Sequence, residues 1–256
     1  MTTKEKQELA KKVRQYAVEM VYNASSGHVG GSLSIADVLV GLYFGVKEDT
    51  DKFVLSKGHA SPALYATLAL KGYLPEDELM TFRALGSRLQ GHPKLNTDIG
   101  IDMSTGSLGQ GVSCACGMAI ADRNTQVWTV LGDGECQEGQ VWESFMFANH
   151  YKLSNLCVII DNNNLQISGK VTDCMNLNPL ADKLKAFGFN VLEIDGHNFD
   201  EIDTALKNAR QEKNRPTAVI AKTIKGKGVS FMENDAGWHG TAPKEEQYNL
   251  AMKELA

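Results

Sequence analysis

Five short apolar runs, separated by segments with helical spacing, restrict the possible folds of this chain more than any other feature. They have the length of strands and lie at 53–55 (FVL), 127–131 (VWTVL), 156–160 (LCVII), 191–194 (VLEI) and 217–221 (TAVIA). Helix-like segments alternate with them at 140–152, 180–187 and 198–213. This alternation predicts a doubly wound α/β fold, in which helices cover both faces of a mostly parallel sheet.

Helices are also expected at both ends of the chain. Apolar residues recur at helical spacing over residues 5–24, and Gly27 ends that helix or opens the next loop. A second helix is expected with Ser34 as its N-cap and Asp37 in a weak capping box. The segment KEEQYNLAMKELA predicts a final helix. Because no repeat or flexible linker divides the sequence, we expect residues 1–256 to form a single domain.

Charge and composition narrow the classes of function. The formal net charge of −5 argues against nucleic acid as the main partner. No apolar stretch is long enough to span a membrane, and the charged N-terminus lacks the apolar core of a signal peptide. The five cysteines form no CxxC pair and are odd in number, which argues against a zinc knuckle or a disulfide framework. These features predict a cytoplasmic protein that does not act in a membrane.

Unusual polar segments follow two of the predicted central strands. Gly132-Asp133-Gly134 comes directly after VWTVL, and Asn163 follows LCVII, 30 positions beyond Asp133. That spacing is one strand–helix–strand crossover, so both segments should lie at the same edge of the sheet. In parallel sheets, ligands bind beyond the carboxyl ends of the strands. Each segment alone is more often a tight turn or a polar loop, but the combination favours a binding site.

The residue types in these two segments suit a magnesium ion that holds a diphosphate. Magnesium prefers about six oxygen ligands, and Asp133 and Asn163 offer a carboxylate and an amide oxygen. A turn after Asn163 can aim a backbone carbonyl, that of Leu165, at the same ion. Gly132 and Gly134 let backbone N–H groups approach phosphate oxygens, because no Cβ stands in the way.

The sequence around these segments, LGDGECQEGQVWESFMFANHYKLSNLCVIIDNNNLQISG, resembles the transketolase family and carries its thiamine diphosphate motif. The resemblance covers essentially the whole chain. It continues through SSGHVGGSLS (25–34), LSKGHASPALYA (55–66), GHPK (91–94), STGSLGQG (104–111), KTIKGKGVSFMEN and WHGTAP. It implies thiamine diphosphate and Mg²⁺ as cofactors, with Asp133, Asn163 and Leu165 as the metal ligands and Gly134 and Asn163 at the diphosphate.

Four of the six histidines stand in loops flanked by glycine. By similarity to transketolases, His59 and His239 donate hydrogen bonds to the diphosphate. His28 and His239 face the reacting carbon and its oxygens, and His92 binds hydroxyls at the reacting end of the sugar. Imidazole suits these tasks because it donates, accepts and moves protons near neutral pH.

The resemblance assigns further contacts to the loop before the small-residue helix VSCACGMAIA, which we expect to be close-packed and buried. Gly106, Ser107 and Leu108 are implied at the aminopyrimidine ring, although many transketolases have proline at the position of Ser107. Glu138 is implied at a subunit interface near the catalytic glutamate of another domain.

Three further features of the sequence concern two histidines and a lysine-rich segment. His150 and His197 are expected to be structural or surface residues, since most single histidines are. The lysine-rich run 222–228 is either a solvated loop or a segment that orders over the cofactor.

Transketolases need a second, pyrimidine-binding domain, which supplies the glutamate for the pyrimidine ring and the arginines for the sugar phosphate. That domain is expected on a partner chain, in a heterotetramer with two copies of each. The resemblance thus implies ketol transfer between sugar phosphates by the N-terminal subunit of a two-chain transketolase.

Three alternatives remain open from the sequence. They are the alpha subunit of a 2-oxoacid dehydrogenase or decarboxylase, a binding subunit without catalytic activity, and a synthase that condenses pyruvate with a triose phosphate. The four loop histidines favour transketolase, because they serve hydroxyl-rich substrates.

Overall fold

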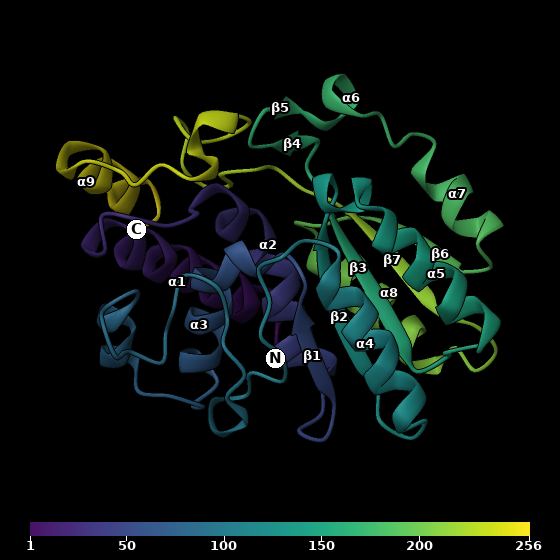
Figure 1. Ribbon diagram of the computed structural model, residues 1–256. Helices are drawn as coiled ribbons and strands as arrows, with labels where there is room; N and C mark the ends of the chain where they lie inside the picture. The colour runs from purple at the N-terminus through teal and green to yellow at the C-terminus, as the bar shows by residue number, and fades with distance from the viewer.

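A computed structural model describes residues 1–256 and has a five-stranded parallel sheet at its centre (Figure 1). The strands lie in the order β1-β2-β3-β7-β6, and every neighbouring pair is parallel. Their bounds are Lys52–Leu55 (β1), Val127–Gly132 (β2), Leu156–Asn162 (β3), Asn190–Asp195 (β6) and Thr217–Lys222 (β7). All five apolar runs therefore form the strands that the sequence predicts.

Helices cover both faces of the sheet, which confirms the doubly wound α/β fold. One apolar core joins the sheet to α1 (Thr3–Asn23), α2 (Gly30–Gly41), α3 (Ser61–Leu70) and α8 (Phe199–Gln211). A second core joins the opposite face to α4 (Gln110–Ala121), α5 (Gly139–His150) and α7 (Leu180–Ala186). The central strands β2 and β3 are apolar along almost their whole length because both of their faces are covered.

Short elements complete the chain. The hairpin β4 (Leu165–Gln166) and β5 (Gly169–Lys170) leads into α6 (Val171–Cys174), and these lie beyond the carboxyl end of β3 (Figure 1). The final helix α9 (Glu245–Glu254) packs beside α1, as expected for KEEQYNLAMKELA. None of the helices combines the length and the apolar character needed to cross a membrane.

Two expectations about helices need correction. The second helix begins at Gly30 after Val29, so the prediction of Ser34 as its N-cap is wrong. Ser34 lies inside the helix, where its hydroxyl donates a hydrogen bond of 2.6 Å to Asp161. Helix α4 is buried on one face only, since Gly117 is exposed and has no neighbour within 4 Å of a Cβ built on it. The small residues of α4 therefore also shape part of the surface.

A buried carboxylate ties together the segments that surround the carboxyl edge of the sheet. Asp161, near the end of β3, is fully buried and accepts hydrogen bonds from Lys57, Ser34 and Thr223. Burial alone would raise the pKa of Asp161, but the Lys57 ammonium and the two hydroxyls hold it below its usual value. This network fixes the loop after β1, helix α2 and the end of β7 relative to β3.

Removal of the Lys57 charge should therefore destabilise the fold. In Lys57→Met, Asp161 keeps its burial but loses its cation, so the free energy of unfolding should fall by about 3–5 kcal/mol. Urea unfolding of the chain without cofactor measures this. The matched control is Lys185→Met, which breaks the exposed pair with Asp182 and should cost no more than about 1 kcal/mol. Equal losses in the two variants would contradict the role given to Asp161.

Candidate active site

The two polar segments predicted to meet do lie together at the carboxyl edge of the sheet. Strands β2 and β3 are direct neighbours, and Gly132 is paired with Asp161 in their register. The buried carboxylate of Asp133 accepts hydrogen bonds from the backbone N–H groups of Gly134, at 2.8 Å, and Asn164. Asp133 therefore joins the loop after β2 to the loop after β3.

The turn after β3 gives Asn163 and Leu165 their orientation. The side-chain oxygen of Asn163 accepts the backbone N–H of Leu165 at 3.0 Å, and Asn164 between them adopts a left-handed φ of 60°. The Leu165 carbonyl accepts a hydrogen bond from the Lys225 ammonium at 3.1 Å.

Asp133, Asn163 and Leu165 line one cavity of about 190 Å³. Its other lining residues are Gly31, Lys57, His59, Leu108, Gly132, Gly134, Glu135, Gln137, Glu138, Gln166, Ile167, Lys225 and His239. The cavity thus collects residues from loops that are far apart in the sequence.

The electrostatics of this cavity fit a metal ion with an anion. Burial, together with the charge of Asp161, raises the pKa of Asp133 to about 6, so a nearby cation would stabilise its carboxylate. Burial, together with Lys57, lowers the pKa of Lys225 to about 8, so an anion would stabilise its ammonium. The candidate metal ligands are all oxygens, which suits Mg²⁺, and no group of three His, Cys, Asp or Glu residues is placed to bind a metal.

The four loop histidines form one cluster beside this cavity. The ring centroid of His28 lies 5.5 Å from that of His59, 5.7 Å from His92 and 5.4 Å from His239. The rings of His59 and His239 are 5.1 Å apart. Only His59 and His239 line the cavity itself, whereas His28 and His92 lie outside it.

These imidazoles are neutral at neutral pH. Burial is the largest cause in each case, and it lowers the pKa of His28 to about 4 and that of His239 to about 3. The pKa values of His59 and His92 are lowered in the same way. A neutral ring offers one donor and one acceptor, so the cluster can bind hydroxyl and carbonyl oxygens and exchange protons with them.

The loop before α4 approaches both the cavity and the histidine cluster. Gly106 has a φ of +144°, and a Cβ there would stand 3.0 Å from the His92 ring, so glycine is required for two reasons. The partly exposed side chain of Leu108 borders the cavity, as does Glu138. Ser107 is exposed and is not among the lining residues.

Sequence reasoning missed the role of Glu135 and left that of Lys225 open. Glu135 is buried and accepts hydrogen bonds from the Ser56 hydroxyl at 2.5 Å, from Gly109 N–H at 3.0 Å and from Gly132 N–H at 3.1 Å. It thus ties three loops of the site together. Its position directly after Gly-Asp-Gly was the available signal.

The remaining uncertain residues are also placed by the structure. Lys225 is buried against His239, with 2.9 Å between its Nζ and the ring Nδ1, so this part of the lysine-rich run is not a solvated loop. Lys222 is exposed. His150 lies exposed at the end of α5, and His197 is bonded to Asp37 away from the cluster.

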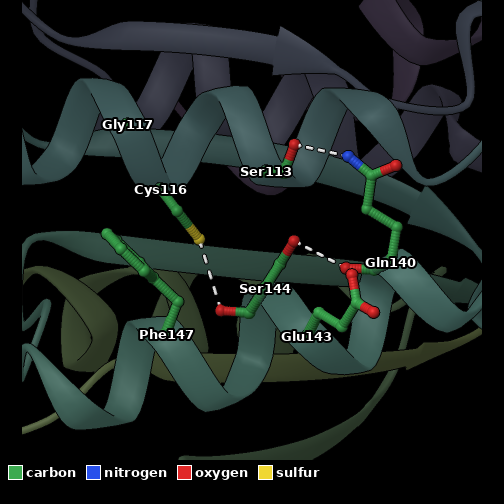
Figure 2. Close-up of a pocket in the computed structure, with 7 residues that line it drawn as sticks. All are labelled: Ser113, Cys116, Gly117, Gln140, Glu143, Ser144 and Phe147. Atoms are coloured by element: carbon green, nitrogen blue, oxygen red, sulfur yellow. Dashed lines mark hydrogen bonds between the residues drawn. The ribbon is translucent and has the colours of Figure 1, made fainter.

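A second hollow, of about 280 Å³, lies between α4 and α5 (Figure 2). There the Gln140 amide donates to the Ser113 hydroxyl at 2.8 Å, and the Ser144 hydroxyl donates to the Gln140 carbonyl at 2.7 Å. Its other lining residues are Cys116, Gly117, Glu143 and Phe147 (Figure 2). No cluster of titratable groups faces this hollow, so we do not assign chemistry to it.

A cavity with oxygen donors and two lysines, beside neutral histidines at the carboxyl edge of a parallel sheet, fits a thiamine diphosphate-binding domain. The sequence supports this class directly, because residues 5–256 match the family described as the thiamine diphosphate binding domain of transketolase. The chain belongs to the transketolase family.

Its relatives fall into two groups by length. The chain is 44% identical to the 6-deoxy-6-sulfo-D-fructose transketolase subunit of Clostridium sp. (strain MSTE9), over 97% of this chain and 95% of that protein. It is 40% identical to an apulose-4-phosphate transketolase subunit of Phocaeicola vulgatus, over 96% of this chain and 92% of that protein. The transketolase of Campylobacter jejuni superposes with a TM-score of 0.91 at 34% identity, over 100% of this chain but only 43% of that one. The 2-oxoacid dehydrogenase alternative is therefore not favoured.

Loss of either oxygen side chain should weaken the binding of thiamine diphosphate with Mg²⁺. For Asp133→Ala and Asn163→Ala we expect a loss of about 100-fold, because changes to residues that only support metal ligands already cost about 10–100-fold. Calorimetric titration with Mg²⁺ and cofactor measures the affinity. Asp182→Ala, on an exposed part of α7, is the control and should bind normally. Unchanged affinity in both site variants would exclude this cavity as the metal site.

Proposed function

We propose that this chain is the cofactor-binding subunit of a two-chain transketolase. With its partner, it transfers a two-carbon ketol unit from a ketose phosphate to an aldose acceptor. The observation that carries this proposal is the cluster of four loop histidines, two of which line the cavity that contains Asp133, Asn163 and Leu165 while the other two lie beside it. A domain that only stored the cofactor would not need His28 and His92 outside the cavity.

Different residues of the cavity bind different parts of the cofactor. Asp133, Asn163 and the Leu165 carbonyl hold Mg²⁺, and His59, His239 and Gly134 contact the diphosphate. Lys225 adds a buried positive charge beside the same anion. Gly106, Ser107, Leu108 and Glu138 are assigned to the ring end, where Leu108 and Glu138 border the cavity. When bound, thiamine diphosphate supplies the carbanion and the electron sink of the reaction.

The histidines outside the diphosphate region act on the sugar. His28 and His239 hold and move protons at the oxygens of the reacting carbon, and His92 binds the neighbouring hydroxyls. Burial keeps their rings neutral, so each can accept a proton without first losing one.

The partner is a chain with the pyrimidine-binding domain, and two copies of each chain form a heterotetramer. This chain spans about 40% of single-chain transketolases, such as that of Pongo abelii, whereas the relatives named as subunits have nearly its own length. We place the partner on the face that runs from Leu108 and Glu138 to the hollow between α4 and α5. That face continues from the cofactor cavity and exposes Met146 and Phe147.

We infer that residues 1–256 act as one domain in the cytoplasm, where the five free cysteines stay reduced. The substrates are sugar phosphates or sugars with another anionic group. Relatives of nearly the same length are named for a sulfosugar and for a sugar phosphate.

Histidine substitutions should separate sugar chemistry from cofactor binding. His28→Ala and His92→Ala should retain cofactor affinity and lose about 10²–10⁴-fold in turnover, the usual cost of one acid–base group. His59→Ala should weaken cofactor binding first, and His239→Ala should lose both. Calorimetry and steady-state kinetics of the two-chain complex measure these effects. His150→Ala is the control, since that ring is exposed on α5. Full turnover in both His28→Ala and His92→Ala would contradict the roles proposed for these two rings at the sugar.

Activity should appear only after the partner chain is added. The purified chain, saturated with Mg²⁺ and thiamine diphosphate, should show no ketol transfer with a panel of sugar phosphates. Addition of the pyrimidine-domain chain should restore it, because positioning of the reacting groups is a large share of the catalysis. Ketol transfer by the single chain would disprove the two-chain proposal.

A further inference from the structure

A series of hydrogen bonds between largely buried groups connects α1 with the loop that carries Lys225. It begins with Arg14, whose guanidinium makes two bonds to the carboxylate of Asp37, at 3.1 and 2.5 Å, and one to the carbonyl of Leu33. Asp37 is only 6% exposed, and its second partner is Nδ1 of His197 at 2.7 Å. Burial would raise the pKa of Asp37, but His197 and Arg14 hold it below its usual value. Asp37 is therefore a charged anchor for His197.

The other nitrogen of His197 faces the backbone. Its Nε2 accepts the N–H of Ile224 at 2.9 Å. An acceptor at Nε2 requires the proton at Nδ1, where the Asp37 carboxylate accepts it, so both partners select the same neutral tautomer. Asp37 thus fixes the position and orientation of the ring. Because the ring is fixed, its Nε2 holds the backbone N–H of Ile224 in one place.

Ile224 directly precedes the lysine of the cofactor cavity. The Lys225 ammonium reaches the Leu165 carbonyl and His239, and its backbone carbonyl accepts the N–H of Asn234. The next residue, Gly226, has a φ of +79° and donates to the carbonyl of Gly30 at 3.0 Å. The hydrogen bond that the Ile224 N–H donates to His197 is a side-chain contact that fixes the Thr223–Ile224 peptide, one residue before Lys225.

We infer that His197 is a positioning residue that, anchored by Asp37 and Arg14, sets the depth to which Lys225 enters the cofactor cavity. The inference rests on the proposed function, because it concerns the lysine assigned to the diphosphate. His197 lies outside the cavity and does not contact the anion. Its effect on anion binding passes through the backbone of Ile224 to Lys225.

Two nearly isosteric substitutions separate this role from ordinary packing. In His197→Gln, the side-chain oxygen reaches the position of Nε2 and keeps an acceptor for Ile224, but the donor to Asp37 is lost. In His197→Asn, the amide nitrogen takes the position of Nδ1 and keeps the donor to Asp37, but the acceptor for Ile224 is lost. A role in packing alone predicts similar behaviour in the two variants.

The test combines two measurements on the full chain. Hydrogen exchange without cofactor reports the backbone of residues 222–228, and calorimetry reports affinity for thiamine diphosphate with Mg²⁺. In His197→Asn the segment should exchange faster and affinity should fall by about tenfold, the effect of one lost hydrogen bond. His197→Gln should lie between His197→Asn and the unmodified chain in both, because it keeps the acceptor for Ile224 and loses only the anchor at Asp37. His150→Asn, at the exposed end of α5, is the matched control and should change neither.

A third variant separates failure of this inference from failure of the proposed site. If Lys225→Met loses affinity while the two His197 variants exchange and bind alike, His197 does not position the lysine and the inference is overturned. If Lys225→Met binds the cofactor normally, the anion site proposed for Lys225 is itself wrong. Weak binding in Lys225→Met, together with the expected difference between His197→Asn and His197→Gln, supports both.

Discussion

The site depends on buried carboxylates, whose hydrogen bonds within the protein hold its loops together. Asp161 receives donors from α2, from the loop after β1 and from the end of β7. Glu135, which lines the cavity, does the same for the loops that carry Ser56, Gly109 and Gly132. A buried charge with all its partners in place is strongly ordering, because each missing partner would be costly in a medium of low dielectric constant. The loops at the sheet edge are therefore not free to rearrange independently. Their rigidity explains how residues distant in sequence come to share one small cavity.

Much of this architecture could be predicted from the sequence, because it follows from patterns that are local. Apolar runs identify all five strands, and the spacing of Asp133 and Asn163 predicts that both lie at the same edge of the sheet, where they follow the neighbouring strands β2 and β3. What escaped prediction depends on contacts between distant segments. Serine is a common N-cap residue, yet the hydroxyl of Ser34 donates a hydrogen bond to Asp161, 127 positions away. Lys225 resembles its exposed neighbour Lys222 in sequence, and only the packing of the loop against His239 buries it. Glu135 and Asp161 look like ordinary acidic residues until the loops that they join are placed in space.

The charges of the site are divided in a way that suits a shared active centre. The acidic and lysine side chains of the site line the cavity, among them Asp133, Lys57 and Lys225. The histidines are neutral, both the two that line the cavity and the two outside it. This chain therefore offers the sugar hydrogen bonds rather than charge. On the proposed function, recognition of an anionic group at the far end of the sugar falls to residues of the partner chain, which we propose to dock along Leu108, Glu138 and the α4–α5 face. The proposal thus predicts that this chain determines the chemistry at the reacting carbon, whereas the partner chain determines which sugar is accepted.

The contact between the Lys225 ammonium and the Leu165 carbonyl has a thermodynamic consequence. This carbonyl is the oxygen assigned to the metal, so the ammonium and the metal ion compete for the same acceptor. An anion that draws the ammonium toward itself frees the carbonyl, and the metal in turn adds positive charge for the anion. Each ligand then raises the affinity for the other, and by linkage the two enhancements are equal. The metal and the diphosphate should enter this site as a cooperative pair, with the lysine as the element that couples them.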